Sequence, residues 1–331
     1  MVRQKKFKQG LLVLLVCFFL LWILLGYLRY RTEGFQEPLV VFFQSFWFMR
    51  DTKLDEGSIQ TKRSFLDLME MIFGVPVTEG TLESSNVLIE AGNYDETVID
   101  KKPWKYSFYF SGEPYYTKHP EKYSIVLAYI KDFSKNFVPF PLYLLYTHIR
   151  PNHKEHYGFP PMLYPVIPPK KGVLVVISND RAQVRKHCID RMEAAGIPLY
   201  FGGKYRNNIG GPIEANHSSP EFYDIVAQYR CVLTMENSDL EYYITEKIFH
   251  GFSANTVPIY WGSKHVTEFF NENRFVNVVD PESNDWIQKI QRLMDDDAFY
   301  LKTIQEPVYV SDPPNLTFDT VAEDCRRILR L

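Results

Sequence analysis

The second half of the chain alternates short apolar runs with amphipathic stretches, which is typical of parallel β-α units. The clearest unit begins with an apolar run at 231–235 and a polar turn. A helix that opens at Thr245, Glu246 and Lys247 follows, and then a second apolar run at 257–261. The length fits a crossover between parallel strands, which brings the carboxyl ends of both strands to one edge of a sheet.

Neighbouring segments extend the same alternation. Strands are predicted at 173–177, 197–201 and 275–279, and helices at 181–195, 220–229, 284–294 and 318–331. This order predicts an α/β domain at 173–331 built on a doubly wound parallel sheet. The last helix could pack back across the junction that precedes this domain.

The first half contains a separate set of apolar runs, at 39–48, 86–91, 106–110 and 124–130, with a helical pattern at 63–73. Short strands between helical or irregular segments predict a further α/β domain at 39–160. Prolines crowd the stretch 139–172, so we expect the domain junction at 161–172. Two α/β domains that face each other make a cleft, where ligands commonly bind.

The N-terminus carries a localisation signal. Residues 11–28 are nearly all apolar and reach about the minimum length of a membrane-spanning helix. Basic residues precede this run, which predicts a cytoplasmic tail at 1–10, a transmembrane anchor at 11–28 and a stem at 29–38, with the rest of the chain across the membrane. A cleaved signal peptide is the alternative, but the run is longer than a typical signal-peptide core and lacks a small-residue cleavage site.

Composition narrows the classes of function. The net charge is −3 and the basic residues are dispersed beyond the N-terminus, so we expect no nucleic-acid partner. The four cysteines form no CxxC pair, so neither a zinc site nor a dense disulfide framework is predicted. An Asp run at 295–297 matches the DxD pattern of metal-dependent nucleotide-sugar enzymes. It follows a helical pattern rather than a strand, which indicates a solvated turn, and no metal site is predicted.

Candidate anion-binding residues lie in the second half. The sequence has neither GxGxxG nor GxxxxGK[ST], so phosphates would be bound by cations and helix N-termini. Lys247 suits a phosphate and Glu246 suits ribose hydroxyls, in a first helical turn capped by Thr245. A Glu that merely favours a helix start beside a solvated Lys is an equally simple interpretation. Arg185 is within reach of a pyrophosphate, although local sequence alone favours an ordinary surface Arg.

A candidate general base lies in the first half. Glu113 follows the apolar run 106–110 and stands between Gly112 and Pro114. These neighbours make a fixed turn that projects the carboxylate toward the predicted cleft, as a general base requires. An ordinary acidic turn residue fits the same positions.

Several ordered motifs together carry a resemblance to a known family. The second half contains ENS at 236–238, YITEK at 243–247 and VPIYWGS at 257–263. Further landmarks are Ser111-Gly112-Glu113, Pro141-Leu142-Tyr143, Ser178-Asn179 with Arg185, and Gly202-Gly203-Lys204. With these motifs the chain resembles the α-1,3/1,4-fucosyltransferases, glycosyltransferase family 10, from about 113 to 279.

The resemblance implies a GT-B fold of two facing Rossmann-like domains, GDP-fucose as the donor, and inverting transfer to an oligosaccharide or glycoprotein. It places Glu113 on the general base, Arg185 and Lys247 on the pyrophosphate, and Glu246 on the ribose. Further donor-binding residues that it suggests are Ser178, Asn179, Lys204, Glu236, Asn237 and Tyr243. Because cations and a helix N-terminus aimed at the pyrophosphate could replace a metal, no cofactor is expected.

The predicted topology bears on location. A transferase on the far side of a membrane needs imported GDP-fucose, which a Golgi lumen can supply, so we expect a single-pass type II Golgi membrane protein. The sequons at Asn216 and Asn315 are candidate glycosylation sites. Two alternatives stay open: a transferase for another GDP-deoxysugar, and a catalytically dead, membrane-tethered glycan-binding protein.

Overall fold

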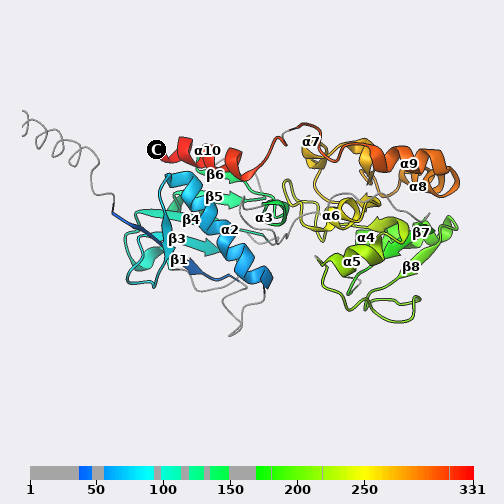
Figure 1. Cartoon of the computed structure of the whole chain (residues 1–331), viewed down its shortest axis with the longest axis horizontal. Helices are drawn as coiled ribbons and strands as arrows, with labels where there is room; N and C mark the ends of the chain where they lie inside the picture. Colours follow the sequence, from blue (N-terminus) through cyan, green and yellow to red (C-terminus); the bar gives the residue numbers. More distant parts are fainter. Residues whose placement is uncertain are drawn as a thin grey trace, which may run out of the picture. The chain divides into compact units, whose positions relative to one another are not determined.

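The computed structural model describes residues 37–46, 56–92, 98–112, 119–129, 135–148, 169–179, 181–217, 219–312 and 314–331 (Figure 1). The predicted tail and anchor, Glu113, and most of the proline-rich junction lie outside these ranges. No helix within them is long and apolar enough to cross a membrane. The chain divides into two compact units, Met1–Leu39 and Val40–Leu331, and the second contains all the elements below except the first residue of β1. The anchor at 11–28 and the domain boundaries therefore stay predictions.

The first sheet has six strands in the order β2-β1-β3-β4-β5-β6. The pairs β1–β3, β3–β4, β4–β5 and β5–β6 are parallel. Every residue of β3 and β5 is buried, as expected for a parallel sheet covered on both faces. The strands are β1 (Leu39–Gln44), β2 (Val77–Glu79), β3 (Val87–Ala91), β4 (Tyr106–Phe110), β5 (Ile125–Ala128) and β6 (Phe137–Pro139), with 3-10 turns at Ile99–Lys101 and Pro120–Lys122 and a short helix α3 (Tyr143–Thr147) after β6.

Helix α2 (Glu56–Phe73) supplies part of the core of the first sheet. Its apolar residues recur at helical spacing, and Phe65, Leu68, Met69 and Ile72 are all buried. The Phe65 ring contacts the rings of Phe46, Phe110 and Phe140, which come from the sheet and its loops. The part of the core around Phe65 is therefore an aromatic cluster, which draws on the aromatic fraction of 16% in the chain.

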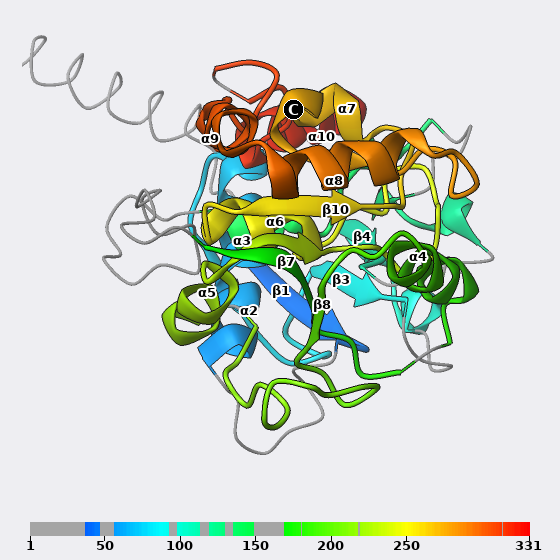
Figure 2. The same cartoon turned by 90° about the vertical axis from the view of Figure 1, so that its right-hand side faces the viewer.

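The second sheet has five strands in the order β11-β10-β9-β7-β8, and all its pairs are parallel. Figure 2 labels β10, β7 and β8 of this sheet. The chain first builds β7 and β8, then returns past β7 to build β9, β10 and β11. The order reverses between β7 and β9, which is the topological switch point of a doubly wound sheet. Its elements are β7 (Lys170–Val175), α4 (Gln183–Ala194), β8 (Leu199–Phe201), α5 (Pro220–Val226), β9 (Tyr229–Leu233), α6 (Lys247–Ser253), β10 (Val257–Tyr260), α7 (Val266–Phe269), a 3-10 turn at Glu272–Arg274, β11 (Val276–Asn277), α8 (Asp285–Asp295) and α9 (Asp297–Gln305).

Alternate residues of this sheet enter two cores. Val173, Val175, Cys231 and Leu233 pack with residues of α4, α8 and α9, which include Cys188, Met192, Trp286, Ile290 and Ile304. Leu174 and Val232 point to the opposite face and pack with Phe222 and Val226 of α5. Because the side chains of a strand alternate between faces, the central positions of these strands, 173–175 and 231–233, are apolar toward both faces.

The C-terminal helix α10 (Phe318–Leu329) returns to the first sheet, where it packs against α2 and β6 (Figure 1). A capping box formed by Thr317 and Thr320 starts it. The Phe318 ring stacks on the His148 ring, with centroids 3.9 Å apart, and Arg326 donates a hydrogen bond to the Met71 carbonyl. Helix α10 therefore covers part of the core of the first sheet.

Element boundaries differ from the sequence prediction mainly at strand ends. β7, β9 and β10 end one or two residues earlier than predicted, at Val175, Leu233 and Tyr260. Hydrogen bonds between neighbouring strands nonetheless continue, since the Thr234 and Glu236 amides donate to the Ile259 and Trp261 carbonyls. The β11 prediction, 275–279, was too long, and helix α2 starts at Glu56, before the predicted 63. Strands β2 and β6 and helix α3 are too short for a periodicity to reveal them.

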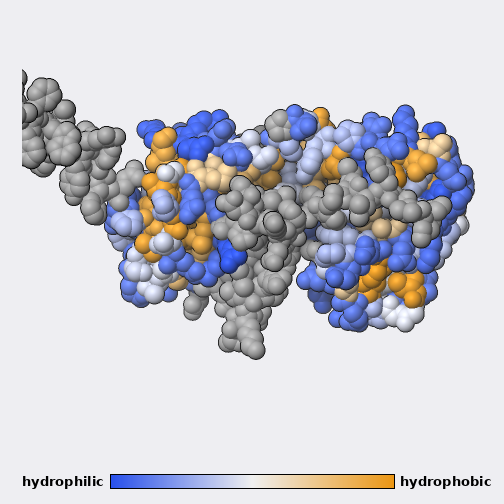
Figure 3. Space-filling model, in the orientation of Figure 1, coloured by the Kyte–Doolittle hydropathy of each residue, from blue (hydrophilic) through white to orange (hydrophobic). Residues whose placement is uncertain are grey.

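The face shown in Figure 3 is mostly hydrophilic where it is coloured, with small apolar areas between. Among the residues that the structure describes, four large apolar side chains are classed as exposed: Val279, Leu301, Val310 and Leu331. Leu301 lies in α9, and the other three lie outside the helices and strands. Scattered exposed apolar residues of this kind are ordinary for a folded protein.

Candidate functional site

The switch point of the second sheet brings together two polar turns. Ser178 and Asn179 follow the carboxyl end of β7, and Glu236 and Asn237 follow that of β9. The two strands are direct neighbours. Open α/β sheets bind ligands outside the carboxyl ends of their strands at such a point, so this edge is the candidate site.

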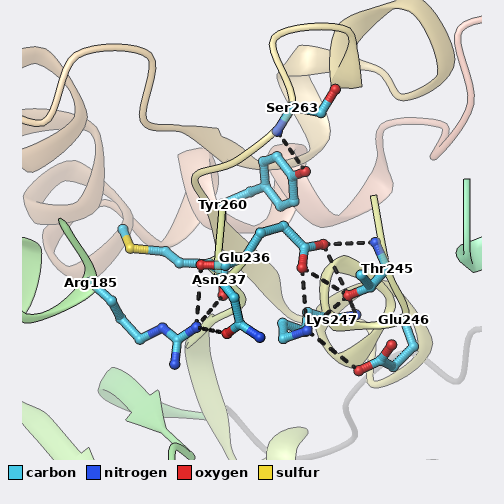
Figure 4. A network of polar contacts seen from close by, with 9 residues as sticks. Arg185, Glu236, Asn237, Thr245, Glu246, Lys247, Tyr260 and Ser263 are labelled. Carbon is cyan, nitrogen blue, oxygen red and sulfur yellow. Dashed lines mark hydrogen bonds and ion pairs between the residues drawn. The ribbon is translucent and has the colours of Figure 1, made fainter. Parts of the chain in front are cut away.

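Arg185 cross-links this edge from α4 (Figure 4). Its Nη2 donates hydrogen bonds to the carbonyl oxygens of Met235 and Glu236, both at 3.2 Å, and to Oδ1 of Asn237 at 2.6 Å. The residue is only 7% exposed, so it is not the ordinary surface Arg that its local sequence favours. Burial lowers the pKa of Arg185, against the opposing effects of Glu236 and Tyr243.

Two nitrogens of this guanidinium have no acceptor among the residues that the structure describes. Among the described residues, Nε is buried with no hydrogen-bond partner, and every hydrogen bond of the group runs through Nη2. A buried donor without a partner is costly, and an anion is a natural acceptor for a guanidinium. Arg185 therefore has one edge fixed by the protein and its remaining donors available for an anionic ligand.

Glu236 is fully buried and holds the residues that precede α6 (Figure 4). Its carboxylate accepts hydrogen bonds from the Thr245 amide at 2.7 Å, from the Thr245 hydroxyl, and from Lys247 Nζ at 3.2 Å. Burial raises the pKa of Glu236, and the Glu246 charge acts in the same direction, while Lys247 and the Thr245 bonds oppose them. Its observed contacts make Glu236 a support for Thr245 and Lys247.

Gly262 makes room for this carboxylate. A Cβ at Gly262 would lie 2.7 Å from Glu236 Cγ and 2.7 Å from the Tyr260 hydroxyl, and its φ of +157° also disfavours other residues. The Ser263 amide donates to the Tyr260 hydroxyl at 3.2 Å, and the Ser263 hydroxyl donates to the Glu241 carbonyl. Gly262 and Ser263 thus close the turn after β10 against the site.

Lys247 and Glu246 stand at the start of α6. The structure begins this helix at Lys247 with Glu246 as the N-cap, one residue later than the predicted cap at Thr245. Thr245 still contributes, because its hydroxyl accepts from the Lys247 amide at 3.4 Å and from Lys247 Nζ at 3.0 Å. The helix starts one residue later because the Thr245 amide donates its hydrogen bond to the Glu236 carboxylate, which follows β9.

Glu246 and Lys247 also pair with each other, with Nζ and Oε1 3.7 Å apart. Burial lowers the pKa of Lys247, but the charges of Glu236 and Glu246 outweigh it and the pKa is raised. Burial raises the pKa of Glu246, but Lys247 and His250 outweigh it and the pKa is lowered. Both side chains stay partly accessible, at 19% for Glu246 and 24% for Lys247, so a ligand can still reach them.

The structure places the other predicted residues unevenly. Ser178, Asn179, Lys204 and Asn237 are exposed, and the Asn179 side chain accepts from the Arg181 amide at 3.1 Å. Gly203 brings the Lys204 loop against β7, since a Cβ there would lie 2.1 Å from the Ile177 carbonyl oxygen. Tyr243 is only 2% exposed. The predicted base Glu113 lies outside the described residues, which stop at Gly112 in this segment.

The remaining predictions concern the surface. Asn216 and Asn315 are both exposed, and Asn315 donates to the Glu268 carbonyl. Within the Asp run, Asp295 ends α8, and Asp296 caps α9 by accepting from the Phe299 amide. No cluster of three or more His, Cys, Asp or Glu residues that could hold a metal occurs in the described ranges.

The comparison with known proteins agrees with this geometry. Residues 168–305 match the family described as "Glycosyltransferase family 10 (fucosyltransferase) C-term". These residues are therefore similar to the C-terminal part of family 10 fucosyltransferases. The matched region contains the second sheet and the candidate-site residues discussed above from Ser178 to Ser263.

Curated relatives match the same part of the chain. An alpha-(1,3)-fucosyltransferase of Helicobacter pylori is 34% identical over 144 residues, which are 41% of this chain and 28% of that protein. An alpha-(1,4)-fucosyltransferase of Arabidopsis thaliana is 30% identical over 156 residues, 41% of this chain and 38% of that protein. The human GDP-fucose protein O-fucosyltransferase 3 is 34% identical over 88 residues, which are 26% of this chain and 18% of that protein. The chain thus matches well under half the length of each relative.

Solved structures extend the likeness to both sheets. A crystal structure of an alpha1,3-fucosyltransferase with GDP-fucose has a TM-score of 0.63 and 21% identity, covering 90% of this chain and 93% of that one. Another crystal structure of an alpha1,3-fucosyltransferase has a TM-score of 0.66 and 20% identity, and the match covers 90% of this chain and 92% of that one. At this identity the likeness shows the fold alone, and it confirms the predicted α/β architecture with parallel sheets.

Sequence reasoning missed part of the site. It did not assign Thr245 and Glu236 as a linked pair, or Gly262 and Tyr260 as parts of the wall around Glu236. The signal was present, because WGS directly follows a buried strand and a Gly there marks a close approach. Contacts between residues that lie far apart in sequence are not visible in a local pattern.

Proposed function

We propose that the protein is an inverting fucosyltransferase, which transfers L-fucose from GDP-fucose to a hydroxyl of an oligosaccharide or glycoprotein acceptor. The new bond is α-1,3 or α-1,4 to N-acetylglucosamine or glucose. The observation that carries the proposal is a pair of fixed cations, Arg185 and Lys247, at the switch point of the sheet in the matched region. A GDP-sugar brings its diphosphate to such an edge.

The two cations suit the leaving group. As the bond between the fucose C1 and the β-phosphate oxygen breaks, negative charge develops on the pyrophosphate. Arg185 is held by three oxygens and Lys247 by Glu236 and Thr245, so neither has to reorganise during the reaction. Charges that are already in place where the transition state needs them contribute most to the rate. Glu246, partly exposed beside Lys247, is placed to accept hydrogen bonds from the ribose.

The acceptor side needs a base. In the proposed step the acceptor oxygen attacks C1 while its proton passes to the Glu113 carboxylate. GDP departs from the opposite face, and the anomeric configuration inverts. Support for this role comes from the sequence, in which Glu113 stands three positions after Phe110, the last residue of β4. The carboxyl end of β4 lies next to those of β3 and β5.

For location, we propose a single-pass type II Golgi membrane protein anchored by residues 11–28. Support comes from the apolar run and the basic residues before it. The measurement is protease protection in sealed microsomes. An epitope at the C-terminus that is digested without detergent contradicts the proposal.

A transfer assay tests the function. The detergent-solubilised protein is incubated with GDP-fucose, or with other GDP-deoxysugars, and a panel of GlcNAc- and Glc-containing acceptors, and product is identified by mass spectrometry. We expect a fucosylated product, and the rate should persist in EDTA because Arg185 and Lys247 meet the diphosphate. Neither product nor GDP release with any acceptor would contradict the proposal. Product from another GDP-deoxysugar alone would replace fucose as the transferred sugar.

The matched variant is Glu113→Gln, which keeps the size of the side chain and removes its basicity. Transfer should fall by about a hundredfold or more, within the range for loss of a general base. The GDP dissociation constant should stay within about twofold, because the predicted base lies on the acceptor side. Near-normal turnover of this variant would remove Glu113 from the mechanism.

A further inference from the structure

One segment of the matched region is held by residues of the first sheet. Tyr242, Tyr243 and Ile244 directly precede Thr245, Glu246 and Lys247. The Tyr242 amide donates to the Tyr129 carbonyl at 2.6 Å, and the Tyr143 amide donates to the Ile244 carbonyl at 3.1 Å. We call residues 242–244 the tyrosine segment. Backbone bonds from both of its ends thus run to the first half of the chain.

Side chains reinforce these bonds. Tyr129 follows β5 and is 2% exposed, and its ring meets the Tyr243 ring edge-on with centroids 5.5 Å apart. Tyr143, the first residue of α3, is 1% exposed and packs on Phe249 of α6 and on Phe270. Edge-to-face aromatic pairs of this kind favour one geometry over others.

Residues of the matched region also contact the segment. Tyr242 stacks on His265, with centroids 4.6 Å apart and planes 23° apart. The Ser263 hydroxyl donates to the carbonyl of Glu241, the residue before the segment. The Tyr243 ring meets the Tyr129 ring, and Tyr243 is one of the groups that oppose the lowering of the Arg185 pKa by burial.

We propose that Tyr129 is a positioning residue for donor binding, which acts through Tyr243 on Arg185 and on the loop that carries Glu246 and Lys247. This inference rests on the proposed function, since the ligand it concerns is the guanosine diphosphate part of the donor. It follows that the geometry of the diphosphate site depends on Tyr129, a residue outside the matched region. Tyr129 would influence donor affinity indirectly, through Tyr243.

The test measures GDP affinity by calorimetry on the full chain. The variant Tyr129→Leu removes the ring, and Tyr129→Phe keeps it. The control is Phe108→Leu, because Phe108 is also buried in the first sheet but its ring packs on Phe73. We expect about tenfold weaker GDP binding in Tyr129→Leu, and affinity within about twofold of wild type in the other two, since coupling between contacting residues has this size. Equal losses in Tyr129→Leu and Phe108→Leu would overturn the proposal.

Two further readouts separate positioning from general destabilisation. If Tyr129 acts through Tyr243, then Tyr129→Leu combined with Tyr243→Leu should bind GDP no more weakly than Tyr243→Leu alone, whereas additive losses contradict the proposal. Hydrogen exchange of the Tyr242 amide in the ligand-free protein should accelerate in Tyr129→Leu beyond the change seen in Phe108→Leu. If the wild-type protein fails to bind GDP, the proposed function is refuted. The hydrogen exchange of the Tyr242 amide then tests separately whether Tyr129 holds the tyrosine segment in place.

Discussion

At the scale of single residues, the site depends on a carboxylate that is not in contact with solvent. Glu236 is buried, and it joins the end of β9 to the start of α6 through Thr245 and Lys247. The sequence placed Arg185, Glu246 and Lys247 at one ligand-binding edge only through the family resemblance, since its local pattern favoured an ordinary surface Arg at 185. It could not predict that Glu236 supports Lys247, because the contact depends on how the turn after β9 folds.

Replacing Glu236 with Gln should lower the free energy of unfolding by about 2 kcal/mol, because Lys247 would lose a buried charged partner. The control is Glu193→Gln, whose ion pair with Arg206 is well exposed and should contribute less than about 1 kcal/mol. Urea denaturation measures both. Equal effects of the two substitutions would mean that the Glu236 ion pair is no stronger than a surface pair.

His250 makes stability depend on pH. Burial lowers the pKa of His250 to about 4, against the effect of Glu246, with smaller contributions from His217 and Lys247. A His whose pKa is lower in the folded state binds protons better when unfolded, so stability falls as pH drops below about 6.5. The shift corresponds to a loss of about 2 kcal/mol between pH 7 and pH 5. His250→Gln should remove that part of the loss, as measured by denaturation at both pH values, and an unchanged pH dependence would contradict it.

At the scale of elements, helix α6 is placed by its packing on β10. The predicted helix opening at Thr245 to Lys247 was correct to within one residue, because a polar turn between two apolar strands leaves few other solutions. Its orientation was not predictable, since it depends on Gly251. A Cβ at Gly251 would lie 2.5 Å from Cγ of Pro258 and 2.8 Å from its Cδ. Gly251 therefore permits close contact between the helix that carries Lys247 and the strand that precedes Gly262.

Gly251→Ala should destabilise the protein by about 1–3 kcal/mol through overpacking, and the displaced helix should weaken GDP binding. Ser253→Ala is the control in the same helix, because the buried Ser253 hydroxyl has no hydrogen-bond partner among the described residues. Its removal should change stability by less than about 1 kcal/mol. Thermal denaturation with calorimetric GDP titration distinguishes the two variants, and a Gly251→Ala protein with wild-type stability would show that the helix has room to move.

At the scale of the whole molecule, the two α/β sheets follow from the alternation of apolar strands and amphipathic helices along the chain. The strand order follows less directly. Nothing in the local pattern shows that the chain passes β7 to build β9, although this reversal creates the site. The route of α10 back to α2 was open in the sequence, because an amphipathic terminal helix fits any uncovered apolar face. The tyrosine segment was not recognised as a link, since its partners Tyr129 and Tyr143 are remote in sequence.

The central claim is that the switch point of the second sheet binds the diphosphate of a guanosine nucleotide. Its most direct test is a calorimetric titration of the wild-type protein with GDP and, separately, with guanosine. If Arg185 and Lys247 meet the diphosphate, GDP should bind at least about a hundredfold more tightly than guanosine, since each charge-assisted contact contributes substantially. Equal affinities for the two ligands, or no binding of GDP, would contradict the account.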